Sequence, residues 1–419
     1  MRSRPRPRSA PSPGRRAAAR AGAAGATPWV SQRLGFGTMM LGGEAHDAAE
    51  SRALLDRAVL EHGIRLLDTA EMYPVPQCAA TAGASERVVG EWLARRRKTV
   101  ARDALVLSTK VCGPSGEMAW IRGGPERVDA RHIRQAVEGS LRRLRVDAID
   151  IFHVHWPDRY VPMFGEDLYD PSRRFVQAGA GKGGGGGGGR QSALSATKAQ
   201  LEEQMAALGV LMREGKVRRV GLSNETPWGL MHCRRLSLQR DGQREQHQHQ
   251  EKEEEEEPGR FFPEVSYVQN AYNLLCRSFD AGLSECCLEE GVHLLAYSPL
   301  AMGLLTGKYR HDFDNQHHPG EDPGDRDRGR EAYRLNVYKG RYAEAEQRYE
   351  RTPAVEAAVR RYCALAAEAG MRPVELALRF VLSHPCLGPD PTLTDIENNM
   401  ATAATREGER KGAGVGGCA

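Results

Sequence analysis

Four side chains that can hold or exchange a proton follow apolar runs of the sequence. They are Asp68, Tyr73, Lys110 and His155. Lys110 and His155 directly follow the apolar runs 104–109 and 148–154, and Tyr73 lies five residues after Asp68. Parallel strands place their carboxyl ends at one rim of a sheet, so these four groups would meet there. A carboxylate, a phenol, an ammonium and an imidazole could together deliver a proton to a bound compound.

The elements needed to position these groups alternate along the chain. We expect strands at 34–38, 65–68, 104–110, 148–154, 217–222, 264–269 and 292–297, and helices starting at Ser85 and covering 133–144, 198–214 and 279–290. Short strands that are apolar on both faces are typical of a covered parallel sheet. Repeated βα units of this number predict an α/β fold, the (β/α)8 TIM barrel. The segment 35–38 has only the first half of G-x-G-x-x-G, which argues against a Rossmann domain.

Composition limits the partners of the chain. Its 419 residues are 40% apolar, which suits one large barrel with tails and insertions. Residues 1–30 hold seven arginines and no acid, and without them the formal net charge changes from +4 to −3, so we expect no nucleic-acid partner. No apolar run approaches the ~18 residues of a membrane span. The nine cysteines include no C-x-x-C pair, which favours free thiols in a reduced compartment.

The first 30 residues are rich in Arg, Ala, Ser and Pro. This composition predicts an organelle transit peptide, with chloroplast favoured over mitochondrion. The alternative is a disordered basic arm on a cytoplasmic protein. The barrel itself is expected to occupy residues 31–400.

Two low-complexity segments are expected to be disordered insertions in the barrel, at about 176–192 and 239–259. The eighth βα unit is expected to be incomplete, because 386–392 holds two prolines and a glycine and cannot form a central strand. We expect residues 401–419 to be a disordered tail. A wrong gene model explains this ending best; a partner that completes the barrel and a degraded non-enzyme are the alternatives.

The strand ends carry motifs that resemble those of the aldo-keto reductase superfamily, closest to its bacterial Tas-type branch. These motifs are LLDTAEMY at 66–73, LSTK at 107–110, VHWP at 154–157, GKVRRVGLSN at 215–224 and YSPLAMGLLTGKY at 297–309. The resemblance covers about two thirds of the chain. It implies an NADP(H)-dependent oxidoreductase that reduces an aldehyde or ketone to an alcohol, with NAD(H) as the other cofactor to consider. The substrate would be a small carbonyl compound, and the oligomeric state is left open.

The resemblance also implies catalytic roles. Tyr73 would be the general acid, and because a free phenol titrates near pH 10, it needs a nearby cation. Lys110 would be that cation, Asp68 would hold Lys110 in place, and His155 would orient the carbonyl oxygen.

The same resemblance assigns the cofactor contacts. Ser223, Asn224 and Gln269 would hold the nicotinamide carboxamide, and Tyr297 would stack on its ring. The diphosphate would lie along 298–303, with Ser298, Leu300, Gly303 and Lys308 as contacts. Thr38, at the end of the first strand, and Asn399, on the adenine side, complete the expected set.

Two other functions remain open from the residues. The first is a nicotinamide-binding barrel that regulates a partner with little turnover, as potassium-channel β-subunit relatives do. The second is a barrel metallohydrolase, because His153 and His155 form H-x-H on one face of a strand. Apart from Asp68, no further histidine or aspartate ligand falls at the other strand ends, so we expect no metal site.

Overall fold

The structure is a computed structural model that describes residues 33–114, 118–124, 127–163, 165–166, 168–176, 187–247, 261–309, 333–339 and 348–387. The expected leader (1–30), the tail (401–419) and Asn399 lie outside these described residues, as do 177–186 and 248–259 of the two insertions.

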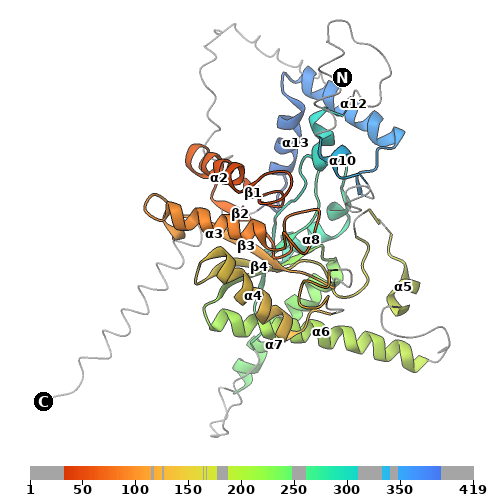
Figure 1. The fold of residues 1–419 in the computed structure, drawn as a ribbon. Helices are drawn as coiled ribbons and strands as arrows, with labels where there is room; N and C mark the ends of the chain where they lie inside the picture. Colours follow the sequence, from red (N-terminus) through yellow and green to blue (C-terminus); the bar gives the residue numbers. More distant parts are fainter. Residues whose placement is uncertain are drawn as a thin grey trace, which may run out of the picture.

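The core of the fold is a parallel sheet whose strands pair in the order in which they occur in the chain. The strands are β1 (Gly35–Gly37), β2 (Leu66–Asp68), β3 (Val106–Val111), β4 (Ile149–Val154), β5 (Val217–Ser223), β6 (Val265–Gln269) and β7 (His293–Leu294). Each falls inside a predicted strand or extends it by one residue. The seven described strands curve into part of a barrel (Figure 1), which confirms the predicted α/β fold and agrees with a (β/α)8 barrel.

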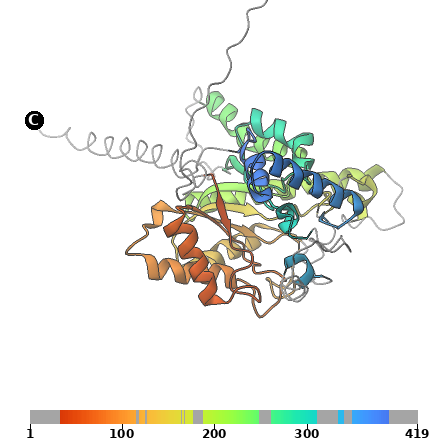
Figure 2. The same cartoon turned by 90° about the horizontal axis from the view of Figure 1, so that it is seen from above.

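Helices connect the strands and lie outside them. They are α2 (Ala48–Asp56), which continues into the π-helical turn η1 (Arg57–Glu61), α3 (Ala84–Arg96), η2 (Arg102–Ala104), α4 (Ala130–Leu144), α5 (Pro171–Val176), α6 (Gly187–Arg213), α7 (Pro227–His247), η3 (Ser278–Ala281), α8 (Leu283–Glu289), η4 (Ala301–Thr306), α10 (Arg334–Val337), α12 (Pro353–Glu368) and α13 (Pro373–Leu382). Seen from above (Figure 2), red and orange helices lie on one side of the strands and green and cyan helices on the other.

Side-chain caps fix where several helices begin. Asp47 and Glu50 form a capping box at α2, and the Asp129 carboxylate accepts from the His132 amide at α4. Thr352 caps α12, and Pro353 occupies its first turn, where no amide donor is needed. The chain therefore enters these helices at fixed residues.

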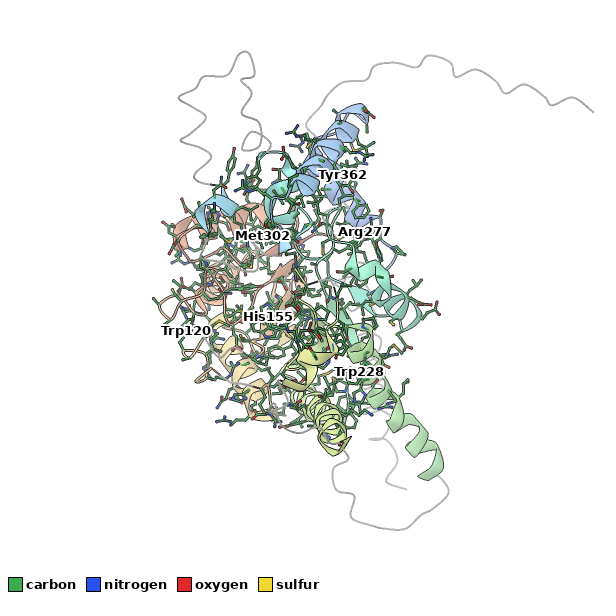
Figure 3. All side chains as sticks on the ribbon, turned by 90° about the vertical axis from the view of Figure 1, so that its right-hand side faces the viewer. Trp120, His155, Trp228, Arg277, Met302 and Tyr362 are labelled. Atoms are coloured by element: carbon green, nitrogen blue, oxygen red, sulfur yellow. The ribbon has the colours of Figure 1, made fainter. Side chains whose placement is uncertain are left out.

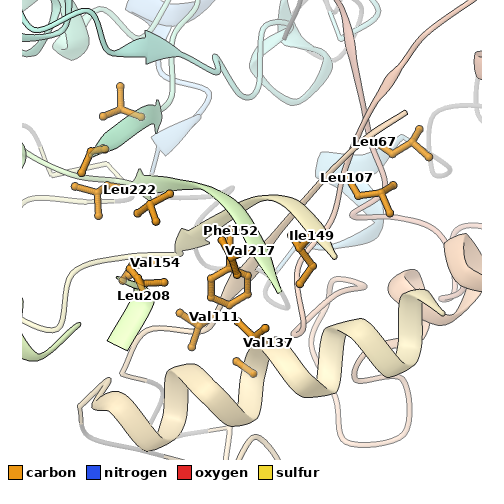
Figure 4. Close-up of a cluster of buried hydrophobic side chains, with 14 of the residues drawn as sticks. Leu67, Leu107, Val111, Val137, Ile149, Phe152, Val154, Leu208, Val217 and Leu222 are labelled. Carbon is orange, nitrogen blue, oxygen red and sulfur yellow. The ribbon is translucent and has the colours of Figure 1, made fainter. Parts of the chain in front are cut away.

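Successive residues of each strand face opposite sides of the sheet, and this alternation divides the core. Outward residues such as Leu107, Phe152 and Val154 pack against the helices (Figure 4). On the inward side, Val106, Ile151 and Tyr267 form a small apolar floor. Above this floor the inward residues include Ser108, Lys110 and His153.

The ends of the described sheet are joined through the segment after α13. The Leu294 amide donates to the Cys386 carbonyl (2.9 Å), and the Arg33 guanidinium, just before β1, donates to the Leu387 carbonyl (2.6 Å). In a (β/α)8 barrel the eighth strand lies between the seventh and the first. Residues 386–387 therefore occupy the start of that position.

The structure differs from the sequence-based expectation at the edges of both insertions. Helix α6 begins at Gly187, and α7 continues to His247, so 187–192 and 239–247 are helical where loops were expected. Arg190 and Gln191 have high helix propensities, as do Gln243, Arg244 and Glu245 in the second segment. The expected helix 279–290 is also divided, because Gly282 has φ 142° between η3 and α8.

We predict that Gly90→Ala, in α3, lowers the free energy of unfolding by about 1–3 kcal/mol. A Cβ at this position would lie 2.2 Å from the Arg143 carbonyl oxygen of α4, so the two helices would have to separate. Urea unfolding followed by circular dichroism measures the change.

The matched control is Gly139→Ala in α4, where the nearest atom to a new Cβ is Nη1 at the far end of the Arg143 side chain, at 2.9 Å, and not a backbone atom. This variant should be unchanged or more stable by up to about 1 kcal/mol, because alanine favours helix. Equal destabilisation of both variants would contradict the close α3–α4 approach.

Candidate active site

The predicted ion pair between Asp68 and Lys110 is present at the carboxyl ends of β2 and β3. Lys110 Nζ lies 2.7 Å from Asp68 Oδ2 and also donates to the Thr69 carbonyl at 2.6 Å. The Lys110 side chain is fully buried. Because a buried ammonium is costly unless it is paired and hydrogen-bonded, these contacts hold its charge at one place.

Two further donors fix the second oxygen of Asp68. Ser108 Oγ donates to Oδ1 at 2.7 Å, and Gln269 Nε2 donates to the same atom at 2.9 Å. Behind them, His153 Nε2 lies 3.1 Å from Ser108 Oγ. The carboxylate is thus held by side chains from β3 and β6 as well as by its ion pair.

The pKa values of the pair follow from burial and mutual attraction. Burial alone would raise the pKa of Asp68, but the Lys110 charge and the hydrogen bonds from Lys110 and Gln269 outweigh it and lower the pKa. Burial lowers the pKa of Lys110, and the Asp68 charge opposes this shift.

Tyr73 and His155 lie on the same rim as the ion pair. Lys110 Nζ lies 5.3 Å from the centre of the Tyr73 ring, and the Tyr73 and His155 rings meet edge to face with centroids 5.7 Å apart. Trp156 packs against His155 at 5.0 Å. Figure 3 shows His155 near the middle of the molecule, with Trp120 and Trp228 on opposite sides. The structure therefore brings all four predicted catalytic residues together.

Two buried histidines, His153 in β4 and His155 directly after it, are held in the neutral form. Burial, followed by the Lys110 charge, lowers the pKa of His153 to about 3 and that of His155 well below its ordinary value. The Nδ1 atoms of both rings are buried and have no hydrogen-bond partner among the described residues. A neutral imidazole keeps one donor and one acceptor nitrogen, which suits His155 to bind a polar oxygen.

The loop that carries Tyr73 is fixed by a second ion pair. Glu71 accepts from the Cys112 amide at 2.6 Å and pairs with Arg122. Ala70, Met72 and Tyr73 belong to an apolar cluster that also contains Ile121, and Met39, Met40, Met118 and Trp156 pack against it. Tyr73 thus belongs to an apolar cluster, with Lys110 and His155 also beside its ring.

The predicted carboxamide contacts lie at the ends of β5 and β6, where they also bind one another. Ser223 Oγ donates to the Gln269 carbonyl at 2.9 Å, and Asn224 Nδ2 donates to the His155 carbonyl at 2.9 Å. Asn224 Oδ1 accepts from Tyr297 Oη at 2.6 Å. Thr38 is buried and donates to the Asp68 carbonyl at 3.0 Å. Ser223, Asn224, Gln269 and Tyr297 are thus gathered beside His155.

The loop after β7 has an unusual backbone. Ser298, Ala301 and Met302 have φ near 50°, and Gly303 has φ 98°. Such left-handed residues turn backbone amides towards one side, a geometry that favours anions. Leu300 packs in the apolar cluster around Tyr73. Lys308 Nζ lies above the Tyr309 and Tyr333 rings, and burial, followed by the Arg334 charge, lowers its pKa.

Several site residues were not predicted from the sequence. Ser108 lies two positions before Lys110, so the two-residue period of a strand could have found it, whereas His153 was predicted only as a metal ligand in the metallohydrolase alternative. Glu71–Arg122 and the buried pair Arg159–Glu225 join residues that are far apart in sequence. For these pairs the sequence pattern offers no guide.

Within the ranges that the structure describes, no group of three or more histidine, cysteine, aspartate or glutamate side chains could hold a metal ion. In the same residues no helix has the length and hydropathy needed to span a bilayer.

Comparisons with known proteins agree with this geometry. The sequence profile described as the Aldo/keto reductase family matches residues 33–399. Protein tas of Escherichia coli (strain K12) is 34% identical over 352 residues, covering 84% of this chain and 82% of that protein. An aldo-keto reductase of Babesia bovis is 36% identical over 213 residues (49% and 61%), and the NADH-specific methylglyoxal reductase of E. coli is 28% identical over 304 residues (69% and 70%). The predicted resemblance to the Tas-type branch is confirmed.

We predict that the fold loses stability as the pH falls below the ordinary histidine pKa of 6.5 towards the folded value of about 3 for His153. In this window the unfolded chain binds a proton that the buried neutral ring does not. Each such ring lowers the free energy of unfolding by about 1.4 kcal/mol per pH unit.

Urea unfolding between about pH 4.5 and 6 tests this, because the Asp68 carboxylate changes the stability only below that window. His153→Gln should reduce the slope by about one proton, whereas His62→Gln, at an exposed position, should leave it unchanged. Equal slopes for wild type and His153→Gln would mean that His153 is charged in the fold.

Proposed function

The chain belongs to the aldo/keto reductase family, and on this basis we propose that it reduces the carbonyl group of a small aldehyde or ketone with NADPH, using Tyr73 as general acid. As a member of this family it is an NAD(P)-dependent oxidoreductase. The observation that carries the finer proposal is the buried Lys110 ammonium beside the Tyr73 ring.

Lys110 assists the release of a proton from Tyr73. When the phenol gives its proton to a carbonyl oxygen, negative charge develops on Tyr73, and a nearby cation in a water-poor site stabilises it. Asp68 keeps Lys110 at that place through the 2.7 Å contact. Loss of Asp68 would leave the ammonium buried with one fewer anionic partner.

His155 orients the oxygen that receives the proton. Its ring is neutral, because burial and the Lys110 charge lower its pKa, so it can donate one hydrogen bond without competing as an acid. The edge-to-face contact with Tyr73 places both rings at one position on the rim. The carbonyl oxygen would lie between them.

The residues present fit a nicotinamide dinucleotide. Ser223, Asn224 and Gln269 offer the hydroxyl and amide groups that pair with a carboxamide, and Tyr297 offers an aromatic face. Ser298, Leu300 and Gly303 form the left-handed loop, and with Lys308 they suit a diphosphate. When bound, the nicotinamide supplies the hydride, while the protein supplies alignment and the proton.

We propose NADPH rather than NADH because the positive charges of Lys308 and Arg334 lie near each other, and the cofactor with one more phosphate group is attracted to them more strongly. The name of the methylglyoxal reductase shows that a relative prefers NADH. The ratio of kcat/KM for the two cofactors tests the proposal. A higher value for NADH would overturn it.

The substrate is proposed to carry an apolar or aromatic substituent. The apolar cluster that contains Tyr73 also contains Ile121, and Met118 and Trp156 pack against it. Such walls favour a hydrocarbon or aromatic group next to the carbonyl over a strongly hydrated one. Consumption of NADPH on a panel of aldehydes, from methylglyoxal to substituted benzaldehydes, ranks the classes.

We predict that Tyr73→Phe lowers kcat for carbonyl reduction by about 10²–10⁴-fold, the contribution of a general acid, while NADPH still binds. Cofactor binding is measured by quenching of tryptophan fluorescence. Tyr272→Phe is the control, because its hydroxyl contacts Asp280 at 3.4 Å, outside the site. Full activity of Tyr73→Phe would exclude Tyr73 as the acid, and NADPH binding without turnover in the wild type would favour a regulatory barrel.

We further propose that residues 1–30 direct the protein to an organelle, the chloroplast before the mitochondrion, because they combine seven arginines with no acid. Fusion of residues 1–30 to a fluorescent protein should give organelle import and removal of the segment. A fusion that remains in the cytoplasm would mean that the segment is a basic arm.

A further inference from the structure

Arg348 lies beside the active site although it precedes helix α12, far along the chain from the sheet residues that it meets. Its Nη1 donates to Tyr297 Oη at 2.5 Å, and its guanidinium lies 5.3 Å from the centre of the same ring. Because Tyr297 Oη donates in turn to Asn224 Oδ1 at 2.6 Å, the phenol hydroxyl is held from both sides.

The chain of contacts continues to the catalytic rim. Asn224 Nδ2 donates to the His155 carbonyl at 2.9 Å. Asn224 itself has φ 53°, a left-handed conformation that needs outside contacts to persist. Arg348 is therefore connected through Tyr297 and Asn224 to the backbone of His155.

The next residue, Tyr349, holds the neighbouring part of the same loop. Its hydroxyl accepts from Asn273 Nδ2 at 3.1 Å, and Asn273 Nδ2 also donates to the Ser298 carbonyl at 2.8 Å. Asn273 is fully buried and Tyr349 nearly so. Burial raises the pKa of Tyr349 to about 12, against hydrogen bonds from the Ser298 and Asn273 side chains.

Arg348 and Tyr349 thus contact consecutive residues at the exit of β7. Arg348 binds the hydroxyl of Tyr297. Tyr349 binds Asn273, which in turn holds the carbonyl of Ser298, a residue with φ 54°. These are the two residues proposed to meet the nicotinamide ring and the start of the diphosphate.

We propose that Arg348 and Tyr349 are positioning residues that fix Tyr297 and Ser298 in the orientation that holds the nicotinamide dinucleotide, and so set how long the cofactor remains bound. This inference rests on the proposed function. Pre-set side chains lose less conformational entropy when a ligand binds, and the resulting difference in affinity falls mainly on the dissociation rate. Neither residue touches the reacting atoms, so the chemical step should change little.

The experiment measures NADPH binding and turnover in Arg348→Met and Tyr349→Phe. In Arg348→Met we expect the NADPH dissociation rate and the KM for NADPH to rise about tenfold, as for loss of one charge-assisted hydrogen bond, with kcat within about twofold. Tyr349→Phe removes a neutral bond, so its rise should be about threefold. Arg348→Lys keeps a charged donor and should recover part of the loss.

Matched controls lie on α12. Arg360→Met removes an arginine paired with Glu356, and Tyr362→Phe removes a phenol bound to the Leu274 carbonyl at 3.2 Å; Figure 3 labels Tyr362 on this helix. Both should leave the dissociation rate unchanged. If Arg348→Met matches Arg360→Met in dissociation rate and KM, the proposal is wrong.

A double-variant cycle tests the route through the Tyr297 hydroxyl. In a Tyr297→Phe background, which keeps the ring, Arg348→Met should add less than about twofold to the dissociation rate. A full additional tenfold rise there would show that Arg348 acts by another route and would overturn the inference. Wild-type protein that fails to bind NADPH would instead overturn the proposed function, and this inference with it.

Discussion

The ion pair between Asp68 and Lys110 sets the conditions for every other group at the rim. A fully buried ammonium is stable only with good partners, and it has a carboxylate oxygen at 2.7 Å and a carbonyl at 2.6 Å. Burial, followed by the same charge, lowers the pKa of His153 and His155, so both imidazoles are neutral. The cation thus supports a developing phenolate at Tyr73 and, together with burial, disfavours protonation of the two neighbouring rings.

The positions of the pair and its partners follow from the two-residue period of strands, which is why this part of the site could be predicted. Asp68, Lys110 and His155 were found from the apolar runs before them, and all seven strands fall where they were expected. Ser108 shares the inward face but lies inside its strand and was not predicted, and His153 was predicted only as a metal ligand of the metallohydrolase alternative. The strand register, with Asp68 beside Ser108 and Lys110 beside His153, is a property of the paired sheet and not of any one segment.

The contacts that hold the loops could not be predicted from the sequence. They join residues that lie far apart in the chain, and no helix or strand periodicity relates one partner to the other. Three buried acids lie close to site residues, and each binds an arginine. Glu71 is two residues before Tyr73, Glu86 accepts from Thr109 beside Lys110, and Glu225 directly follows Asn224. Each carboxylate also accepts from a second group, such as the Cys112 amide for Glu71. Removing one partner would leave a buried charge uncompensated, so these pairs resist movement of the loops. Composition can show that such charges exist but not which of them meet.

The two ends of the described sheet bear on the same site. β1 leads to Thr38, which donates to the Asp68 carbonyl, and β7 leads to Tyr297 and Ser298. Arg33 ties the start of β1 to the carbonyls of 382 and 387, and Cys386 accepts from β7, so the segment after α13 contacts both edges. Unpaired strand edges bend and fray more easily than paired ones. The residues at this junction therefore help to keep the Asp68 rim and the Tyr297 loop at a fixed separation, which a ligand bound to both would require.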